Sequence, residues 1–491
     1  MRMRGSFPAW LDAAHFLNLL FLSLLARSGL QILGAFPRLY LNDDCTPGHE
    51  LVWFHRGKRS PKVVATSLDE EADMPGWLAL PGGRALGLGR HWHFVSLLGW
   101  VLTGFVYVVL LFATDEWRRL VPTSWSVFPL ALSAAGDYLH LSFPPELPGL
   151  PYNALQQLAY FAVVFLLAPF QIATGAAMSP AVIGAAPWYA RLFGGKQKAR
   201  TLHFLGLLAF FGFVIVHTAM VIWHGLPSEL AKIVLGEPAA DRGEAVAVGA
   251  FGLLMVVLIH IAGARFSRND PRGAQHLLGL PVDAVQRALT VRLRSHQSYP
   301  RSAVSPFHWI NGRPPQSAEY GAQAAAGFAD WRLEVGGLVE RPLRLGLEDL
   351  VAMPRRSQVV KHNCIQGWSA IAEWTGVAMA DLLERACVRP EARFVVVRAF
   401  ADPKAEAGDY YETIDLKVAR APQCLLAYGM NGRPLPVEHG APLRLRVENQ
   451  LGFKMVKWVS RIELVADYRQ IGEGQGGWRE DHMYYSREVA I

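Results

Sequence analysis

Five long apolar segments limit what this chain can fold into. Each has about the 20 apolar residues that a helix needs to cross a bilayer, and together they cover residues 13–35, 92–113, 155–178, 202–223 and 245–264. Lipid offers no hydrogen bonds to a polypeptide backbone, so such a segment must be helical to satisfy its own amides. We therefore expect an α-helical transmembrane bundle of about five spans in the first half of the chain.

A further apolar stretch, residues 125–143, is interrupted by Pro129, Asp137 and His140. A stretch broken in this way suits the membrane surface better than the hydrocarbon core, so we expect an interfacial amphipathic segment here. If it spanned the bilayer instead, every later loop would change side.

From residue 302 onward the 491-residue chain has the pattern of a soluble domain. Short β-like runs alternate with turns that contain Gly, Pro and Asp, and one helical stretch covers residues 378–387. We predict a multi-domain protein with a transmembrane domain at 1–266, a linker at 267–301 and a mixed α+β, mostly β domain at 302–491.

Charge and cysteine content exclude several classes of protein. The formal net charge is +7, but the cations lie in loops that flank the apolar segments, which is typical of membrane proteins. We therefore expect no nucleic-acid partner. The four cysteines have no paired spacing, which argues against a disulfide framework and against a zinc site. The N-terminal residues show no evident cleavable signal peptide and no twin-arginine run.

Two histidines, His203 and His217, stand 14 residues apart in the fourth apolar segment. On a helix this separation is close to four turns, so both imidazoles face nearly the same side, about 21 Å apart. Each can supply one axial ligand to a haem, and each haem then needs a second histidine from another helix. Ionisable residues within spans are rare and mark functional sites. The alternative is that these histidines are hydrogen-bonded in the core or lie at the headgroups.

The order of the segments selects the second ligands. The end of the fourth span near His217 shares a membrane side with the start of the first span, and the end near His203 shares a side with the start of the second. We predict the same pairs whichever way the chain is inserted, namely His15 with His217, and His93 or alternatively His91 with His203. The remaining His224 and His260 are interpreted as packing or interface residues, with a haem-propionate or quinone contact as the alternative.

The same half of the chain resembles a known family. The phrases HFLNLLFLSLLARSGLQI, RHWHF, YNALQQLAY and ARTLHFLGLLAFFGFVIVH are similar to the b-type di-haem cytochrome subunits of nickel-iron hydrogenase, formate dehydrogenase and thiosulfate reductase. The resemblance covers about residues 10–225 and implies quinone-linked electron transfer through two b-haems. The ligands it implies are His15, His93, His203 and His217. Those subunits have four spans, so a fifth span here would put the C-terminal domain on the side of the His93/His203 haem.

In the second half, a single cysteine stands in the stretch VVKHNCIQGWSAIAEWTG, residues 359–376. Cys364 ends a short apolar run, and a glycine and two tryptophans follow it. This pattern suggests a turn that presents one thiolate into a pocket, where it can bind a soft or high-valent metal. The alternative is a buried structural cysteine.

A basic stretch follows at residues 422–464. His439, Arg444, Lys454 and Lys457 lie there among β-like runs separated by Gly and Pro turns. Clustered cations of this kind can bind the phosphate of a cofactor, since Arg binds an anion with two hydrogen bonds and Lys adds a point charge. The alternative is a solvated face of a β domain.

The motifs CIQGWS, WTGV, YYETIDL, NGRPLPVEHGAPLRL and GFKMVKW resemble, in this order, the molybdenum-cofactor domain of the sulfite oxidase family. The resemblance spans about residues 302–464. It implies a molybdenum ion bound by one molybdopterin and by one cysteine thiolate, Cys364. The cofactor contacts that it implies are Ser305, His308, Trp309, His439, Arg444, Met455, Val456 and Lys457.

The sequence departs from that family at the substrate side. Sulfite oxidases carry arginines just after the cysteine, where this chain has the run Gln366–Ser369, and Phe307-His308-Trp309 replaces their Arg-Asn-His entry motif. The form CIQGWS is similar to the bacterial branch that contains the methionine sulfoxide reductase catalytic subunit. An uncharged pocket lined by tryptophan suits a neutral S-oxide better than the sulfite dianion.

Together these features predict a membrane-bound molybdenum oxidoreductase. We expect oxygen-atom transfer on a small oxo-compound, an S-oxide or sulfite-like molecule, coupled through two b-haems to a quinone pool. The alternatives are a non-catalytic electron relay or redox sensor whose soluble domain binds a partner, and a transporter that only resembles a cytochrome. The sequence leaves open whether the chain forms a homo-oligomer.

We expect a multi-pass protein of the bacterial inner membrane. The loop regions that share a side with the C-terminal domain carry thirteen Lys and Arg, against six on the other side. By the positive-inside rule this excess favours a cytoplasmic molybdenum domain. The resembling cytochromes favour the periplasm, because their equivalent side is periplasmic.

Overall fold

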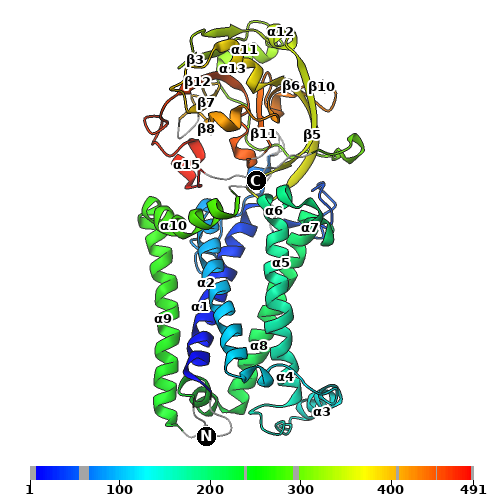
Figure 1. The fold of residues 1–491 in the computed structure, drawn as a ribbon, viewed down its shortest axis with the longest axis vertical. Coiled ribbons are helices and arrows are strands. Elements are labelled where there is room, and N and C mark those ends of the chain that lie inside the picture. Colours follow the sequence, from blue (N-terminus) through cyan, green and yellow to red (C-terminus); the bar gives the residue numbers. More distant parts are fainter. Residues whose placement is uncertain are drawn as a thin grey trace. The chain divides into compact units, whose positions relative to one another are not determined.

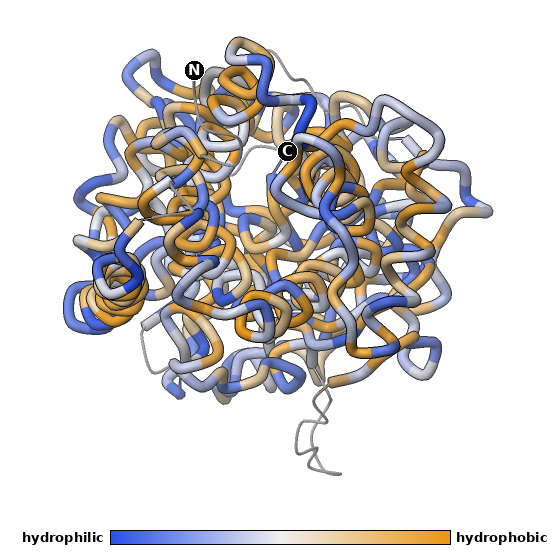
Figure 2. Tube along the Cα trace, turned by 90° about the horizontal axis from the view of Figure 1, so that it is seen from below, coloured by the Kyte–Doolittle hydropathy of each residue, from blue (hydrophilic) through white to orange (hydrophobic). Residues whose placement is uncertain are grey.

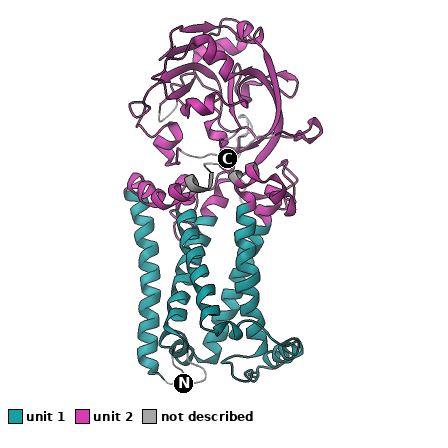
Figure 3. Cartoon of the chain, in the orientation of Figure 1, with its two compact units in different colours: residues 1–29, 92–176, 202–269 teal, residues 30–91, 177–201, 270–491 magenta. Residues whose placement is uncertain are grey.

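The computed structural model describes residues 7–54, 66–236, 240–290, 298–404, 408–448 and 450–487. The chain forms two compact units (Figure 3). Unit 1 comprises residues 1–29, 92–176 and 202–269, and unit 2 comprises residues 30–91, 177–201 and 270–491. The basic run at 55–62, which contributes to the predicted charge asymmetry, lies outside the described residues.

Among the described residues, five helices are long and apolar enough to cross a membrane, as predicted. They are drawn in Figure 1 and are α1 (Ala9–Ala35), α2 (Leu86–Ala113), the segment Ala154–Met178, α8 (Lys196–Val234) and α9 (Arg242–Asn269). The segment Ala154–Met178 contains α4 (Ala154–Phe161), a π-helical turn (Ala162–Leu167) and α5 (Ala168–Met178). Figure 2 colours the chain by hydropathy, with hydrophobic residues in orange. The length and apolar composition of the five helices make the protein a multi-pass membrane protein.

The interrupted apolar stretch forms the short helix α3 (Val127–Leu139). Its 13 residues extend about 20 Å, which is less than the roughly 30 Å of a bilayer core. This length agrees with five spans rather than six. The interfacial position of α3 stays a prediction.

Glycines allow the helices of unit 1 to pack closely. A Cβ atom at Gly99 of α2 would lie 2.3 Å from a ring carbon of Phe21 on α1, and Trp100 Nε1 donates to Asn18 Oδ1 at 3.0 Å. At Gly252 of α9 a Cβ would lie 2.3 Å from the ring of Phe16. In lipid the hydrophobic effect does not drive helices together. Small residues at helix contacts let the backbones approach closely, and van der Waals packing then stabilises the contact.

The C-terminal domain of unit 2 contains two five-stranded sheets. The first sheet, in the order β10-β9-β6-β5 with β11 also paired to β9, consists of β5 (Arg355–Asn363), β6 (Ser369–Ala378), β9 (Cys424–Met430), β10 (Arg433–Pro434) and β11 (Arg444–Val447). The second, in the order β4-β3-β12-β7-β8, consists of β3 (Leu333–Gly337), β4 (Leu343–Leu345), β7 (Phe394–Ala399), β8 (Tyr411–Asp415) and β12 (Val459–Val465). All pairs are antiparallel except β12 with β3.

One hydrophobic core contains residues of both sheets, including Trp374 of β6, Val397 of β7 and Leu426 of β9. Short helices and a two-stranded ribbon complete the unit, namely α6 (Pro180–Ala185), α7 (Pro187–Leu192), α10 (Pro271–Thr290), α11 (Ala318–Ala325), α12 (Leu347–Val351), α13 (Met379–Ala386), α14 (Leu416–Ala419), α15 (Trp478–Met483), β1 (Arg38–Leu39) and β2 (Val52–Trp53). The predicted fold class, a helical bundle with a mixed and mostly β domain, is confirmed.

The compact units do not follow the predicted domain boundaries, which stay a prediction. Unit 2 includes the loop regions 30–91 and 177–201 as well as the C-terminal half. Helix α10 occupies residues 271–290 of the predicted linker, and the linker residues 291–297 lie outside the described part of the chain.

Candidate cofactor sites

Cys364 lies in a tight turn between β5 and β6. Its backbone N–H donates to the carbonyl of Trp368 at 3.0 Å, and the N–H of Gly367 donates to the carbonyl of Cys364 at 3.1 Å. Gly367 has a φ of +116°, which a side chain would strain. Asn311 Nδ2 donates to Cys364 Sγ at 3.3 Å. The thiol is 3% exposed, so the turn holds one sulfur in an enclosed place.

Segments from the first half of the chain hold this turn. Ser67 Oγ donates to Gln366 Oε1 at 2.7 Å, and Gln366 Nε2 donates to the carbonyls of Ser67 and Ala35 at 3.2 and 3.3 Å. Gln197 Nε2 donates to the carbonyl of Gly367 at 2.9 Å and to Ser369 Oγ at 3.0 Å. Both sides of the turn are therefore fixed by residues outside the C-terminal domain.

Asp43 joins the same segments electrostatically. Its carboxylate accepts from the N–H of Gln197 at 2.8 Å and pairs with Lys361 Nζ at 2.5 Å. Burial alone raises the pKa of Asp43, but the Lys361 charge and the amide hydrogen bond bring it below its ordinary value. Asp43 is thus a stable carboxylate between the first loop and β5.

Buried cations and aromatic rings cluster next to the turn. His308 lies 5.2 Å from His439, 5.4 Å from His362 and 5.5 Å from Trp368, measured between ring centroids. The Arg444 guanidinium lies 5.0 Å from the centroid of a Trp374 ring. These side chains come from the segment before α11, from β5, β6 and the turn between them, and from the region 437–447 that ends in β11, which are far apart in the sequence.

The charge and the unused hydrogen-bonding atoms of this cluster fit an anionic cofactor. In the described part of the chain, His308 Nε2 and Arg444 Nε are buried without a hydrogen-bond partner. Burial and the neighbouring cations lower the pKa of His439 to about 3 and bring that of Arg444 to about 9. Burial and Arg444 also hold the pKa of Lys457 well below its ordinary value. A bound anion would compensate this accumulation of positive charge. The phosphate of molybdopterin is such an anion, and it needs cationic hydrogen-bond donors of this kind.

Four of the predicted cofactor contacts have other hydrogen-bond partners or are buried among apolar residues. Ser305 pairs with the backbone of Ile371, with the serine hydroxyl accepting from the Ile371 N–H at 2.9 Å. Trp309 Nε1 donates to the carbonyl of Cys45 at 2.8 Å, and Val456 is buried in the hydrophobic core. Met455 is also buried. Contact of these residues with the cofactor stays a prediction.

Several residues that the sequence did not single out belong to the site. They are Asn311 and Ser67, described above, and His362, Arg446 and Arg479. Arg446 donates to His362 Nδ1 at 3.0 Å and forms a buried ion pair with Glu448 at 2.7 Å. The alternation Arg444-Leu-Arg446 on one strand was a signal, because residues two apart share a face. Arg479 had no such signal.

Burial raises the pKa of the Cys364 thiol, while Arg479, the Asn311 hydrogen bond and Lys196 act in the opposite direction. Arg479 is buried, and its Nη1 contacts Met483 Sδ at 2.8 Å. Met483 packs against the hydrophobic cluster that contains Cys364. A thiolate at this position therefore has cationic neighbours, as a metal-bound thiolate needs.

In unit 1 the predicted haem ligands face each other in two pairs. The ring centroids of His15 and His217 are 6.3 Å apart, and those of His93 and His203 are 6.5 Å apart. An iron held at about 2 Å from one nitrogen of each ring needs ring centres roughly 6 Å apart. Both pairs therefore fit a bis-histidine haem.

Hydroxyl groups orient the second pair. Ser28 Oγ lies 3.1 Å from His93 Nδ1, and Thr174 Oγ1 lies 3.1 Å from His203 Nδ1. Hydrogen bonds to the ring nitrogen that does not bind metal fix the orientation of a ligand. A Cβ at Gly175 would lie 3.5 Å from the ring of His203. A small residue at position 175 therefore avoids crowding the His203 ring.

The other histidines have different surroundings. His91, the alternative ligand, has Gly87 O at 2.8 Å from Nδ1 and Ser486 Oγ at 3.1 Å from Nε2, and it does not face His203. His260 lies between Ser23 and Arg27, at 2.8 and 2.7 Å. His224 packs on Phe143 with ring centroids 4.4 Å apart.

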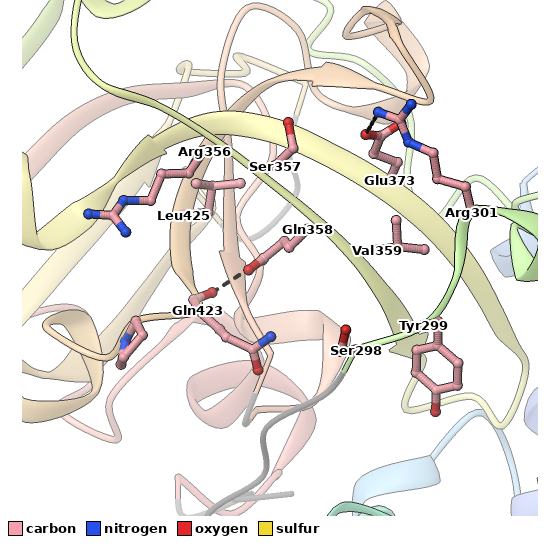
Figure 4. Close-up of a pocket in the computed structure, with 11 residues that line it drawn as sticks. Ser298, Tyr299, Arg301, Arg356, Ser357, Gln358, Val359, Glu373, Gln423 and Leu425 are labelled. Carbon is pink, nitrogen blue, oxygen red and sulfur yellow. Dashed lines mark hydrogen bonds and ion pairs between the residues drawn. The ribbon is translucent and has the colours of Figure 1, made fainter.

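A separate hollow of about 530 Å³ lies beside β5 (Figure 4). Its lining includes Gln358, which donates to the carbonyl of Gln423 at 3.3 Å, and the ion pair between Arg301 and Glu373. The hollow includes none of the predicted cofactor contacts. We therefore regard the buried cluster beside Cys364, and not this hollow, as the candidate molybdopterin site.

The fold, the two kinds of site and the family models that match each part define a multi-pass membrane oxidoreductase with a cytochrome b part and a molybdopterin-binding part. Residues 6–236 match the family model described as prokaryotic cytochrome b561. Residues 321–471 match the model of the oxidoreductase molybdopterin binding domain. The cofactors of these domains are haem b and molybdenum-molybdopterin.

Curated relatives are similar to parts of this chain. A subunit named YedZ1, assigned to a protein-methionine-sulfoxide reductase of Azospira oryzae, is 33% identical over 38% of this chain and 64% of its own length. The protein-methionine-sulfoxide reductase catalytic subunit MsrP of Xanthomonas axonopodis pv. citri is 35% identical over 28% of this chain and 46% of its own length. The corresponding subunit of Gluconobacter oxydans is 36% identical over 28% and 47%. The chain thus spans about half to two thirds of the length of these relatives.

Proposed function

We propose that this chain reduces small S-oxides at a molybdenum site and draws the electrons from quinol through two b-haems. The observation that carries the proposal is the presence, in one chain, of two facing histidine pairs and an enclosed cysteine beside a buried cationic cluster. Two relatives that are similar to parts of this chain are named as subunits of protein-methionine-sulfoxide reductases, which supports an S-oxide as the substrate class.

The reduction of an S-oxide to the sulfide breaks the sulfur–oxygen bond, takes up two electrons and two protons, and releases the oxygen as water. When bound, the molybdenum cofactor supplies this two-electron oxygen-atom transfer. Cys364 would ligate the metal, with Asn311 donating a hydrogen bond to its sulfur. Arg444, His439 and Lys457 would hold the cofactor phosphate.

The His15/His217 and His93/His203 pairs would carry electrons one at a time, because each haem iron exchanges a single electron. The number and order of the predicted spans support the His93/His203 haem as the one on the side of the molybdenum domain. The molybdenum domain is assigned to the cytoplasmic side of a bacterial inner membrane on the positive-inside rule. A reporter fused to the C terminus and active in only one compartment tests this assignment.

The central experiment is a haem-reoxidation assay on the purified protein. Wild-type protein reduced with a quinol analogue is expected to contain molybdenum and to be reoxidised by S-oxides. Cys364→Ser is expected to keep the reduced haem spectrum and lose reoxidation, whereas the control Cys387→Ser, at a more exposed cysteine outside the site, keeps both. Absence of molybdenum from protein made in a cofactor-competent host refutes the proposal, and retained biological activity in Cys364→Ser would favour an electron relay or sensor.

Haem content tests the ligand assignment. The wild type is expected to bind two haems, and His217→Ala to bind one, because the His93/His203 pair does not depend on it. His224→Ala is the control and is expected to retain two, since His224 packs on Phe143 rather than facing a second histidine. A loss of one haem in the control, or of none in His217→Ala, contradicts the assignment.

A further inference from the structure

The Cys364 site is covered by parts of the chain that do not belong to the matched molybdopterin domain. One buried hydrophobic cluster contains Cys364 and Trp368 together with residues from three other segments, namely Ala35, Phe36, Tyr40, Cys45, Leu86 and Tyr485. The matched domain comprises residues 321–471. The wall next to the thiol therefore includes residues that lie outside the matched domain.

The cover is fastened by buried polar contacts. The N–H of Ser67 donates to the carbonyl of Ile310 at 2.7 Å, next to Asn311, whose side chain contacts the thiol. Arg38 and Glu70 form an ion pair at 2.7 Å in which both side chains are 1% exposed. Buried pairs of this kind hold a fixed geometry, because separating the partners leaves a charge without compensation.

Gln366 connects the cover to the thiol. Its amide makes three hydrogen bonds to Ser67 and Ala35, and its Oε1 lies 3.8 Å from Cys364 Sγ. The side chain that stands where sulfite oxidases carry charge is therefore held by the loop after the first membrane helix. This makes Gln366 a positioning residue whose orientation depends on Ser67.

We propose that segments 35–45, 66–70 and 483–485 form a closed wall of the substrate pocket and restrict it to small oxo-compounds. A methionine sulfoxide within a folded protein brings its backbone and neighbouring residues with it. To reach Cys364 it would have to displace buried residues of the cover and break the hydrogen bonds of Gln366. The inference rests on the proposed function, since it specifies the substrate of the same site.

The first test compares substrates on the full-length holoenzyme. The reduced holoenzyme is mixed with dimethyl sulfoxide, with free methionine sulfoxide, or with calmodulin whose methionines have been oxidised. Reoxidation of its haem is then followed. We expect kcat/KM for the small compounds to exceed that for the oxidised protein by about 100-fold or more. Ratios within about threefold overturn the proposal.

The second test needs no turnover. Protein from a host that cannot make molybdopterin is labelled in a Cys387→Ser background, with Cys364→Ser subtracted as the blank. We expect N-ethylmaleimide to label Cys364 about tenfold faster than a polymer-linked maleimide, because labelling follows access to the thiol. Equal labelling rates for the two maleimides overturn the proposal that these segments close off Cys364.

Two variants separate the wall from general unfolding. Ser67→Ala removes the hydroxyl that holds Gln366 and is expected to raise polymer labelling of Cys364, whereas Ser357→Ala, on β5 but hydrogen-bonded to Thr375, leaves it unchanged. Unchanged labelling in Ser67→Ala counts against the role of Gln366. If no S-oxide reoxidises the haem while the labelling results hold, the proposed function fails and the closed wall stands.

Discussion

Replacing Lys454 with methionine is expected to destabilise unit 2, because Lys454 lies between two buried carboxylates. Its Nζ is 3.0 Å from Glu412 and also pairs with Glu480. All three side chains are at most 2% exposed. Burial lowers the pKa of Lys454, but the two carboxylates raise it above its ordinary value. Burial and Glu480 raise the pKa of Glu412. The Lys454 ammonium therefore compensates the negative charge of two buried carboxylates.

The magnitude follows from this burial. Removing one partner of a buried ion pair costs about 3–5 kcal/mol. For a domain of this size each kcal/mol lowers the melting temperature by about 2–4 °C, so Lys454→Met is expected to lower that of unit 2 by about 10 °C. The variant Lys454→Met, Glu412→Gln, Glu480→Gln removes all three charges and is expected to recover most of the loss.

The assay can follow the two parts of the molecule separately. Cys424 is buried in the core of the C-terminal domain, so its reaction with a thiol reagent on heating reports unfolding there. The haem Soret band reports unit 1 and is expected to melt at the wild-type temperature. A Lys454→Met protein that melts like the wild type refutes the reasoning. So does a triple variant as unstable as the single one, because the loss would then come from packing and not from charge.

Three other changes have expected outcomes. Gly99→Ala places a Cβ 2.3 Å from an aromatic ring of α1 and is expected to cost about 1–3 kcal/mol, measured by haem melting. Gly104→Ala, where nothing lies within 4 Å, is the neutral control. His439 has a folded pKa of about 3 against about 6.5 unfolded, so the unfolded state binds the extra proton between these values. Unit 2 of the cofactor-free protein is therefore expected to lose up to about 1.4 kcal/mol per pH unit on acidification in that window, and His439→Gln is expected to flatten the slope. Asp43→Asn weakens the pair with Lys361, in which Asp43 is 22% exposed, and is expected to cost about 1–3 kcal/mol, seen as a lower melting temperature of unit 2.

The sequence predicted the elements whose signal is local. Apolar length identified the five membrane helices, and the 14-residue spacing of His203 and His217 with the order of the spans selected the facing pairs. The choice between His91 and His93 stayed open, because both stand at the start of the same span. The structure turns His93 toward His203 and gives His91 the carbonyl of Gly87 and the hydroxyl of Ser486 as partners.

Contacts between distant parts of the chain had no such signal. Ser67 and Gln366 are 299 positions apart, and neither residue type identifies the other as its partner. Arg479 lies beyond the matched domain, in a stretch without a motif. Burial of this kind is decided by tertiary packing, which sequence periodicity does not describe.

The hydrogen bonds of Gln366 and Gly367 also bear on how a gene of this kind can be divided. A gene split near residue 301 would yield a catalytic half whose turn lacks Ala35, Ser67 and Gln197, the groups that satisfy its amides and carbonyl. Without these segments the Gln366 amide and the Gly367 carbonyl would need water or a partner subunit for their hydrogen bonds. A separated catalytic half is therefore expected to require a partner that supplies equivalent groups around Cys364.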